Sequence, residues 1–307
     1  MIQLNNVTVY FDNALKSTRV TALDDVSFTI NQGDCFAMIG QNGAGKSTAM
    51  YCLLGLLKPQ KGTVTIDGKE FMLGSSRYNN IGYLPEEPHY ADFLTVEEAL
   101  YFYSGLYNKV VTKKQRDEIL GEMGLFDKRF TQLKKCSKGM KQKLGIAQAI
   151  ITEPDILFLD EPTRGLDPII SRYFKQRLIN MKQKGSTIII NSHVLSEVES
   201  LANRAVIIDK GKVVVQDELI NITNSGEGRY QVEYEGKQAK RPAYLTNSRT
   251  TGALVIGSIP EEKLGEFMAF LDKNSLRLHK CDLNRMTLED SFFNLIKGDN
   301  NEPSTEA

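Results

Sequence analysis

The segment Gly40–Thr48, read as GQNGAGKST, constrains the fold of this chain more than any other part of its sequence. Its spacing, G-x-x-x-x-G-K-[ST], puts glycines at Gly40 and Gly45, where the backbone must wrap closely around a phosphate. Lys46 reaches the β- and γ-phosphates, and the Ser47 hydroxyl is suited to hold Mg²⁺. The pattern predicts a cradle for a nucleoside triphosphate, completed by Asn42, Gly43, Ala44 and Thr48.

The cradle requires a strand before it and a helix after it. Residues 35–39 form a short apolar run suited to a buried parallel strand, and residues 47–57 carry apolar side chains at helical spacing. The alternative is a glycine-rich turn that matches the pattern by accident. These flanks favour the phosphate cradle.

Composition limits the remaining possibilities. The chain has 307 residues, enough for one large and one small domain, and its 38 basic and 38 acidic residues cancel. The overall charge therefore gives no reason to expect a nucleic-acid or anionic-membrane surface. No apolar stretch approaches the roughly 18 residues of a membrane span and no signal peptide precedes the fold, so we expect a soluble, unsecreted chain. The four cysteines are far apart, and we expect neither a disulfide nor a zinc site.

The first 39 residues read as antiparallel strands, and residues 62–68 as a further hairpin strand closed by Asp-Gly. Tyr10 and Phe11 are predicted to end the first hairpin. Phe11 is our candidate to stack on an adenine ring, with packing under the sheet as the alternative. For Tyr10 the packing role is favoured.

From about residue 90 to 152 the pattern becomes helical. Thr95 with Glu98, and Thr112 with Gln115, have the spacing of capping boxes at two helix starts. A further helix is predicted to open at residues 136–140, where free N–H groups suit an anion, although an ordinary helix start fits as well. The lysines around it are typical of a solvated basic face. We interpret residues 90–152 as an inserted helical subdomain.

Two buried strands are predicted to end in polar side chains. The apolar run of residues 156–159 delivers Asp160 and Glu161 to the carboxyl end of a strand, where ligands bind in open α/β sheets. Because side chains alternate along a strand, one carboxylate is expected to hold Mg²⁺ while the other faces a water molecule. His193 follows a second such strand and is interpreted as functional rather than structural.

Five segments in this order resemble the nucleotide-binding subunit of an ATP-binding cassette (ABC) transporter: GQNGAGKST, CSKGMKQKL, ILFLDEP, RGLD and NSH. The resemblance covers residues 1–219. It implies an α/β fold, the P-loop NTPase cassette, with a mostly parallel core sheet, an antiparallel β subdomain and an inserted helical subdomain.

The resemblance also implies roles for individual residues. ATP and Mg²⁺ would be held by Lys46, Ser47 and Thr48, with Asp160 on the metal; Glu161 would polarise the attacking water and His193 would contact the γ-phosphate. Asp167 would lie at a dimer contact, and Ser137 and Gly139 would complete the site of a second, head-to-tail copy or homologous cassette. Separate transmembrane permease subunits would hold the chain at the cytoplasmic face of the membrane, and no nucleic-acid partner is expected.

Two departures from the family pattern stand out. The usual Leu-Ser-Gly-Gly-Gln is replaced by residues 136–140, CSKGM, which keep the serine and the second glycine. The usual glutamine is replaced by Glu86, which is able to bind Mg²⁺ or water but has no amide to donate. The segments 82–87, GYLPEE, and 137–142, SKGMKQ, resemble the branch that drives bacterial type-2 exporters, whose membrane subunits are separate chains.

Residues 220–298 are interpreted as a small α+β accessory domain. Strands are predicted at 230–234, 253–259 and 276–283, and a helix after Pro260 with an apolar face of Leu264, Phe267, Met268 and Leu271. Dimer packing is the simpler role for this domain, and ligand sensing the alternative. Thr287 is predicted to cap a last helix, and residues 299–307 to be a disordered tail.

Two other uses of such a cassette remain open. A soluble ATPase acting on nucleic acid or the ribosome would usually carry a long heptad arm or two cassettes, whereas this chain has one cradle and a modest insert. A non-hydrolysing nucleotide sensor is the second alternative, and Glu161 argues against it. The sequence does not name the transported substance.

Overall fold

The computed structural model describes residues 1–13, 18–71, 80–107, 109–223, 228–236, 241–284 and 287–298. The chain divides into two compact units, Met1–Leu219 and Ile220–Ala307. The predicted tail, residues 299–307, lies outside the described residues.

The first unit contains an antiparallel sheet and a mostly parallel one. The antiparallel sheet has the order β2-β1-β4-β5, formed by Thr18–Ile30, Ile2–Asn13, Lys61–Ile66 and Lys69–Glu70. The second sheet has the order β10-β9-β3-β8-β7-β6, formed by Lys212–Glu218, Arg204–Asp209, Cys35–Ile39, Thr187–Asn191, Ile156–Asp160 and Ile81–Leu84. Only β10 runs antiparallel to its neighbour in that order.

The three central strands β3, β7 and β8 are buried along their whole length, as continuous apolar runs in parallel sheets are expected to be. Along β7, Leu157 and Leu159 join one hydrophobic cluster, while Ile156 and Phe158 join a second. This alternation sends the side chains of one strand to opposite faces. The parallel sheet therefore has a hydrophobic core on each of its two faces.

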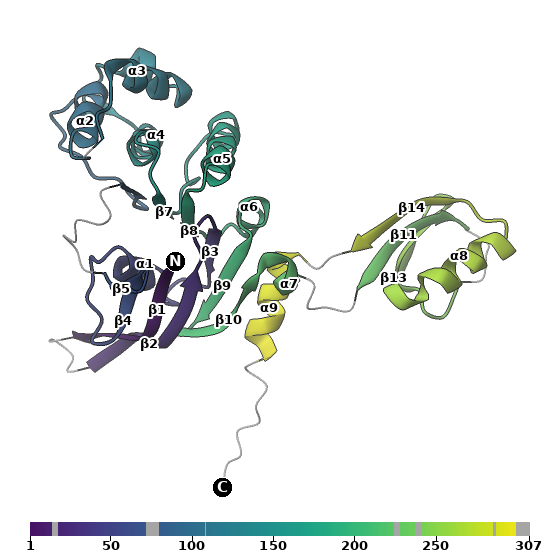
Figure 1. Ribbon diagram of the computed structural model, residues 1–307. Coiled ribbons are helices and arrows are strands. Elements are labelled where there is room, and N and C mark those ends of the chain that lie inside the picture. The colour runs from purple at the N-terminus through teal and green to yellow at the C-terminus, as the bar shows by residue number, and fades with distance from the viewer. Residues whose placement is uncertain are drawn as a thin grey trace, which may run out of the picture. The chain divides into compact units, whose positions relative to one another are not determined.

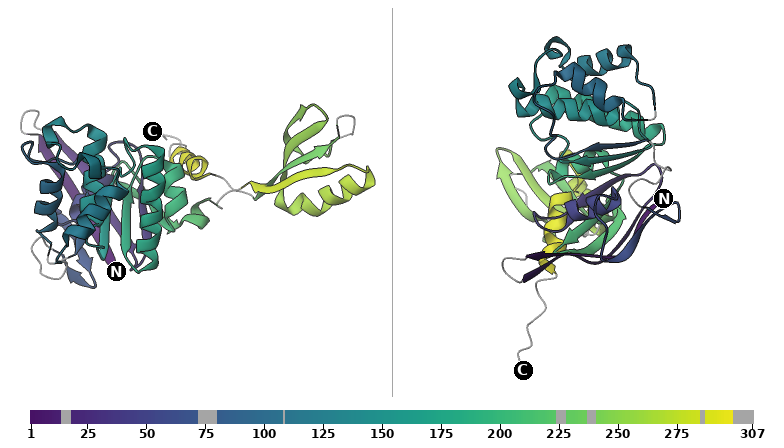
Figure 2. Two further views of the ribbon diagram at one scale, coloured as in Figure 1. Left: turned by 90° about the horizontal axis from the view of Figure 1, so that it is seen from above. Right: turned by 90° about the vertical axis from the view of Figure 1, so that its left-hand side faces the viewer.

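Helices cover the parallel sheet on one face. They are α2 (Val96–Ser104), α3 (Lys113–Glu122), α4 (Lys138–Ile150) and α5 (Pro168–Gln183), with two short 3₁₀ turns at Phe126–Lys128 and Leu133–Lys135. The opposite face packs on α1 (Lys46–Leu53) and the antiparallel sheet (Figures 1 and 2). Two short helices, α6 (Leu195–Leu201) and α7 (Leu219–Thr223), complete the described helices of residues 1–223.

Helices α2 and α3 begin at the two predicted capping boxes. The Thr95 side chain accepts from the Glu98 N–H, and the Glu98 carboxylate accepts from the Thr95 N–H at 2.8 Å. Thr112 and Gln115 form the same reciprocal pair at the start of α3. Both capping boxes are confirmed, and each provides partners for N–H groups that a helix start leaves without intrahelical acceptors.

Two element boundaries differ from the sequence prediction. Helix α1 ends at Leu53 rather than Leu57, because Gly55 takes a left-handed φ of 68° that stops the helix. Strand β1 continues past Tyr10 and Phe11 to Asn13, which pairs with Thr18. The first hairpin is therefore longer than its aromatic residues suggested.

The second unit has an antiparallel sheet of order β12-β13-β11-β14, formed by Thr246–Thr251, Leu254–Pro260, Arg229–Glu235 and Leu278–Asn284. Helix α8 (Leu264–Lys273) packs on one face, preceded by a 3₁₀ turn at Glu261–Lys263. Helix α9 (Leu288–Gly298) follows Thr287, whose hydroxyl accepts from the Asp290 N–H.

Two features of this unit differ from the prediction. Strand β12, with the polar sequence TNSRTT, was not predicted, because an exposed edge strand lacks alternating apolar side chains. Met268 is 44% exposed, while Phe267 and Leu271 are buried and Phe270 packs partly on the core. The apolar stripe of α8 is thus rotated toward Phe270, and the prediction for Met268 was wrong.

Candidate functional site

A cavity of about 830 Å³ lies at the carboxyl ends of β3, β7 and β8. Ligands of open α/β sheets bind at this edge of the sheet. It is lined by Val20, Thr21, Ala22, Gly40, Gln41, Asn42, Gly43, Gly45, Lys46, Ser47, Thr48, Glu86, Asp160, Glu161, Arg164, Asn191 and His193. Side chains and loops far apart in the sequence therefore meet in one cavity.

The loop between β3 and α1 depends on two glycines. A Cβ atom at Gly40 would lie 2.3 Å from the Ile208 carbonyl oxygen, and one at Gly45 would lie 2.4 Å from the Ala22 carbonyl oxygen. Gly45 also has a φ of 106°, a conformation that side-chain-bearing residues rarely adopt. Glycine at both positions lets the loop press against its neighbours, so that the first residues of α1 line the cavity.

Lys46 is the buried cation of the cavity. Its ammonium group donates to the carbonyl oxygens of Gly40 at 2.7 Å and Gln41 at 3.0 Å. Burial lowers the pKa of Lys46, and the negative charges of Glu161 and Asp160 oppose that shift. The positive charge therefore depends on the anions that share its cavity.

Asp160 is the last residue of β7 and is 3% exposed. Its Oδ1 accepts from the Asn191 amide at 2.6 Å. Burial raises the pKa of Asp160 to about 6, which the hydrogen bond from Asn191 partly offsets and the charges of Glu86 and Glu161 increase. Nearby, Asn191 Oδ1 is buried without a partner among the described residues.

This geometry fits a divalent cation. A buried carboxylate with a raised pKa and an unpartnered buried amide oxygen both gain from a positive charge or its bound water. Mg²⁺ in such sites is held by one or two side chains together with substrate phosphates. Ser47 lines the same cavity and supplies a hydroxyl.

Glu161 follows β7 with a φ of 47°, which turns the chain out of the strand direction. Its N–H donates to the Asn191 carbonyl oxygen at 2.8 Å. Its carboxylate accepts from the His193 N–H at 3.1 Å, and its Oε2 lies 2.8 Å from His193 Nδ1. The left-handed turn and these contacts bring carboxylate and imidazole together at the cavity, with the imidazole largely exposed to it.

Five residues predicted for the site do not line this cavity. Ala44 is buried beneath the loop, and Phe11 is 49% exposed on β1, opposite Val20, which does line the cavity. Ser137, the serine kept from the usual Leu-Ser-Gly-Gly-Gln, caps α4 by accepting from the Met140 N–H, and Gly139 lines a neighbouring cavity. Asp167 caps α5 and is paired with Lys143 at 2.6 Å, a hydrogen bond that lowers the pKa of Asp167. Their predicted ligand roles stay predictions.

Asn191, Arg164 and Gln41 also take part in the site, although no role was predicted for them from the sequence. Asn191 orients Asp160, Arg164 pairs with Glu86, and the Gln41 carbonyl accepts from Lys46. Gln41 lies within GQNGAGKST, Arg164 within RGLD and Asn191 within NSH. Their presence in these motifs was the sequence signal that could have predicted a role in the site. The partners of Asn191 and Arg164 lie 31 and 78 positions away in the sequence and follow only from the fold, whereas the partner of Gln41 lies within the same loop.

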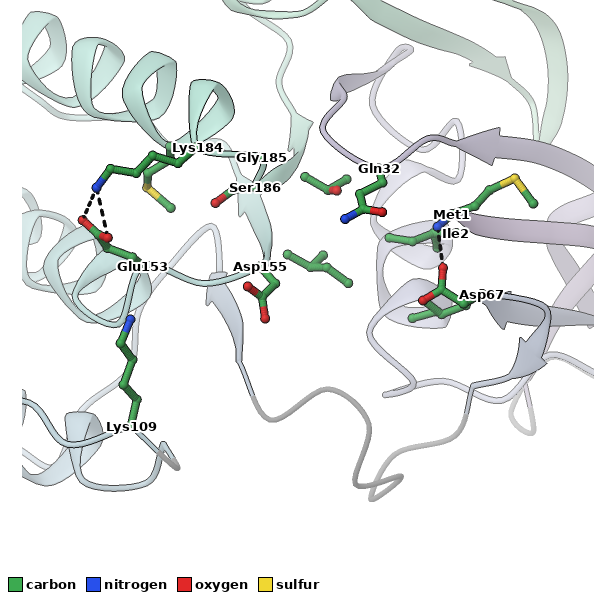
Figure 3. A pocket seen from close by; sticks show the side chains of 14 residues that line it. Met1, Ile2, Gln32, Asp67, Lys109, Glu153, Asp155, Lys184, Gly185 and Ser186 are labelled. Carbon is green, nitrogen blue, oxygen red and sulfur yellow. Dashed lines mark hydrogen bonds and ion pairs between the residues drawn. The ribbon is translucent and has the colours of Figure 1, made fainter.

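A second cavity, of about 540 Å³, lies where β7 and β8 begin (Figure 3). Its cationic groups are engaged: Lys184 pairs with Glu153 at 2.9 Å, the amino terminus with Asp67 at 2.7 Å, and Lys109 donates to the Thr152 carbonyl oxygen at 2.7 Å. It lies at the amino ends of the strands, away from the phosphate loop. We assign it no part in nucleotide binding.

Comparison with known proteins identifies the family to which this chain belongs. The sequence pattern of the family described as ABC transporter matches residues 23–164. The ABC transporter ATP-binding protein YhcH of Bacillus subtilis is 33% identical over 96% of this chain and 95% of its own length. This chain is an ABC transporter ATP-binding protein. Membership assigns ATP binding and ATP hydrolysis to it, and the predicted P-loop cassette fold is confirmed.

Other relatives of this ATP-binding protein carry more specific names. The bacitracin transport ATP-binding protein BcrA of Bacillus licheniformis is 31% identical over 90% of this chain and 93% of its own length. A solved ATP-binding subunit of an ABC transporter has 30% identity and a TM-score of 0.64, over 73% of this chain and 92% of its own. Among the described residues, no helix is long and apolar enough to span a bilayer.

Proposed function

We propose that this ATP-binding protein energises a membrane exporter by hydrolysing Mg²⁺-ATP between two head-to-tail cassettes. The observation that carries the proposal is the convergence of the phosphate loop, Asp160, Glu161 and His193 in one cavity. Exporter names among the relatives, such as the fluoroquinolones export ATP-binding protein of Mycobacterium tuberculosis, 35% identical over 70% of this chain, support the direction.

In the proposed reaction, water attacks the γ-phosphate in line with the departing diphosphate. Bound Mg²⁺ supplies charge stabilisation to the phosphate oxygens, and Ser47 and Asp160 are the residues proposed to hold it. Glu161 orients the water and accepts its proton. His193, 2.8 Å from Glu161, holds that carboxylate. We propose that its imidazole also contacts the γ-phosphate.

Lys46 has two roles in this proposal. Its ammonium group donates to two carbonyl oxygens of the loop itself. Phosphate oxygens are stronger acceptors for a cation than neutral carbonyls, so we expect Lys46 to turn to the β- and γ-phosphates on binding. Lys46 would thereby both hold the loop and stabilise the charge of the phosphates.

The head-to-tail dimer is proposed because Ser137 and Gly139 do not line the nucleotide cavity of their own chain. Ser137 and Gly139 stand at the start of α4, outside the lining of the nucleotide cavity. In a head-to-tail arrangement this helix start would face the γ-phosphate of the other protomer, where free N–H groups stabilise an anion. Closure on ATP would then move the helical subdomains and drive the permease subunits at the cytoplasmic face.

Capture of a membrane partner tests this proposal. The tagged Glu161→Gln chain, which is expected to keep ATP, is purified from membranes with Mg²⁺-ATP, with Lys46→Ala as the matched control. A multi-spanning protein bound to the first variant and depleted from the second supports the exporter subunit. Recovery of nucleic acid or ribosomal proteins instead would refute it.

A further inference from the structure

An ion pair lines one side of the nucleotide cavity. Arg164 donates from Nη1 to Oε1 of Glu86, and both side chains line the cavity. The same two residues line a smaller cavity of about 280 Å³, together with Lys138 and Gly139 at the start of α4. The Glu86–Arg164 pair therefore forms part of the wall between the nucleotide cavity and the start of α4.

The two partners belong to different structural elements. The Arg164 N–H donates to the Glu161 carbonyl oxygen at 3.2 Å. Arg164 is therefore held by the turn that carries Glu161, the residue proposed to orient the water. Glu86 stands two residues after the end of β6, in the segment that leads into the helical subdomain. The pair thus ties the entry to the helical subdomain to the turn that follows β7.

The charges of the cavity explain why Glu86 needs a cation. The described lining contains three carboxylates, Glu86, Asp160 and Glu161, but only two basic side chains other than histidine, Lys46 and Arg164. The charge of Glu86 already disfavours ionisation of Asp160. ATP is a polyanion, so an unpaired Glu86 would repel it. A neutral glutamine, usual at this position in the family, would need no such partner.

We propose that Arg164 is a positioning residue that holds Glu86 at the cavity rim until Mg²⁺-nucleotide enters, when Glu86 turns to the metal side. The inference rests on the proposed function, because it takes Mg²⁺-ATP as the ligand. It makes Arg164 the residue that compensates for a carboxylate at position 86. Its consequence is that Arg164 sets how strongly nucleotide affinity depends on Mg²⁺.

The test measures binding of a non-hydrolysable ATP analogue to the full chain, with Mg²⁺ and with EDTA. Arg164→Gln is expected to weaken binding in EDTA about fivefold, the upper range for an exposed ion pair, and to change it much less with Mg²⁺. Glu86→Gln is expected to strengthen binding in EDTA by a similar factor. Arg164→Lys, which keeps the charge, should stay within about twofold of the parent.

The double variant Glu86→Gln/Arg164→Gln decides whether Arg164 acts through Glu86. The proposal expects it to bind like Glu86→Gln alone. An equal loss from Arg164→Gln in both backgrounds would mean that Arg164 contacts the nucleotide directly, and would overturn the proposal. Arg172→Gln is the matched control, because Arg172 is exposed on α5 and does not line the cavity.

The failure of this inference is distinguishable from failure of the proposed function. A parental chain that does not bind the analogue with Mg²⁺ refutes the ATPase site itself. A parental chain that binds it, with an Arg164→Gln variant of unchanged affinity in EDTA and Mg²⁺, refutes only the role of Arg164. Unfolding temperatures equal to that of the parent establish that each variant is folded.

Discussion

Glu161→Gln isolates the proton-accepting role of the carboxylate, because the amide has the same shape and keeps one acceptor oxygen. The Glu161 side chain is 13% exposed and accepts from the His193 N–H at 3.1 Å, a contact that a glutamine oxygen retains. The change therefore removes a charge and a base without opening a cavity. The arrangement of the phosphate loop should be unaffected.

The expected loss of hydrolysis rate follows from the proposed role of Glu161 as the base that accepts the proton of water. Removal of a general base lowers a rate by about 10²- to 10⁴-fold, which raises the barrier by roughly 3–5 kcal/mol. ATP affinity should stay equal or rise by up to about fivefold, because one carboxylate fewer repels the phosphates. Slow turnover with retained binding is the combination that identifies a base.

Phosphate release from saturating Mg²⁺-ATP measures the rate, and light scattering with ATP reports whether the slow variant accumulates as a dimer. Glu118→Gln, on the exposed face of α3, is the matched control and should hydrolyse ATP at the parental rate. A Glu161→Gln rate within about twofold of the parent would show that another group accepts the proton. The reasoning from the Glu161–His193 pair would then be wrong.

Four further substitutions probe the nucleotide site and the packing that supports it. Lys46→Ala removes the buried cation, so calorimetry should show ATP affinity reduced about tenfold or more; unchanged affinity would exclude the cradle. Asp160→Asn should raise the free energy of unfolding of the nucleotide-free chain by about 1–3 kcal/mol at pH 8, where parental Asp160 is ionised above its pKa of about 6. Urea unfolding should show this gain shrink toward pH 5, where the parental carboxyl is protonated in the fold, and a gain that grows on acidification contradicts the sign. Gly45→Ala should abolish ATP binding in calorimetry, because the added Cβ atom would lie 2.4 Å from the Ala22 carbonyl oxygen. Gly121→Ala, in open space on α3, should instead raise the free energy of unfolding in urea by up to about 1 kcal/mol.

Local patterns carried most of the fold prediction. The phosphate loop, the buried strands β3, β7 and β8, and the capping boxes at Thr95 and Thr112 are each encoded within a few consecutive residues. Short-range geometry and burial determine such elements, so the sequence alone suffices to locate them.

Contacts between side chains far apart in the sequence could not be predicted from local patterns. Arg164 and Glu86 are 78 positions apart, and Asn191 and Asp160 are 31 apart. No periodicity links such residues, because the strand order of the sheet decides which loops become neighbours. The edge strand β12 was missed for another reason, since its exposed polar residues lack the alternation that marks a half-buried strand.

The hydrophobic cluster on the helical face of the parallel sheet joins residues of α2, α3, α4 and α5 with Leu157, Leu159, Ile188 and Ile190 of the strands. Gly145 of α4 lies so close to β6 and the segment after it that a Cβ atom would be 2.7 Å from side-chain atoms of Leu84 and Pro88. The helical subdomain and the sheet thus share one interior. A subdomain joined in this way is expected to move by shear, in small sliding steps between packed side chains, because hinge opening would expose that interior to water.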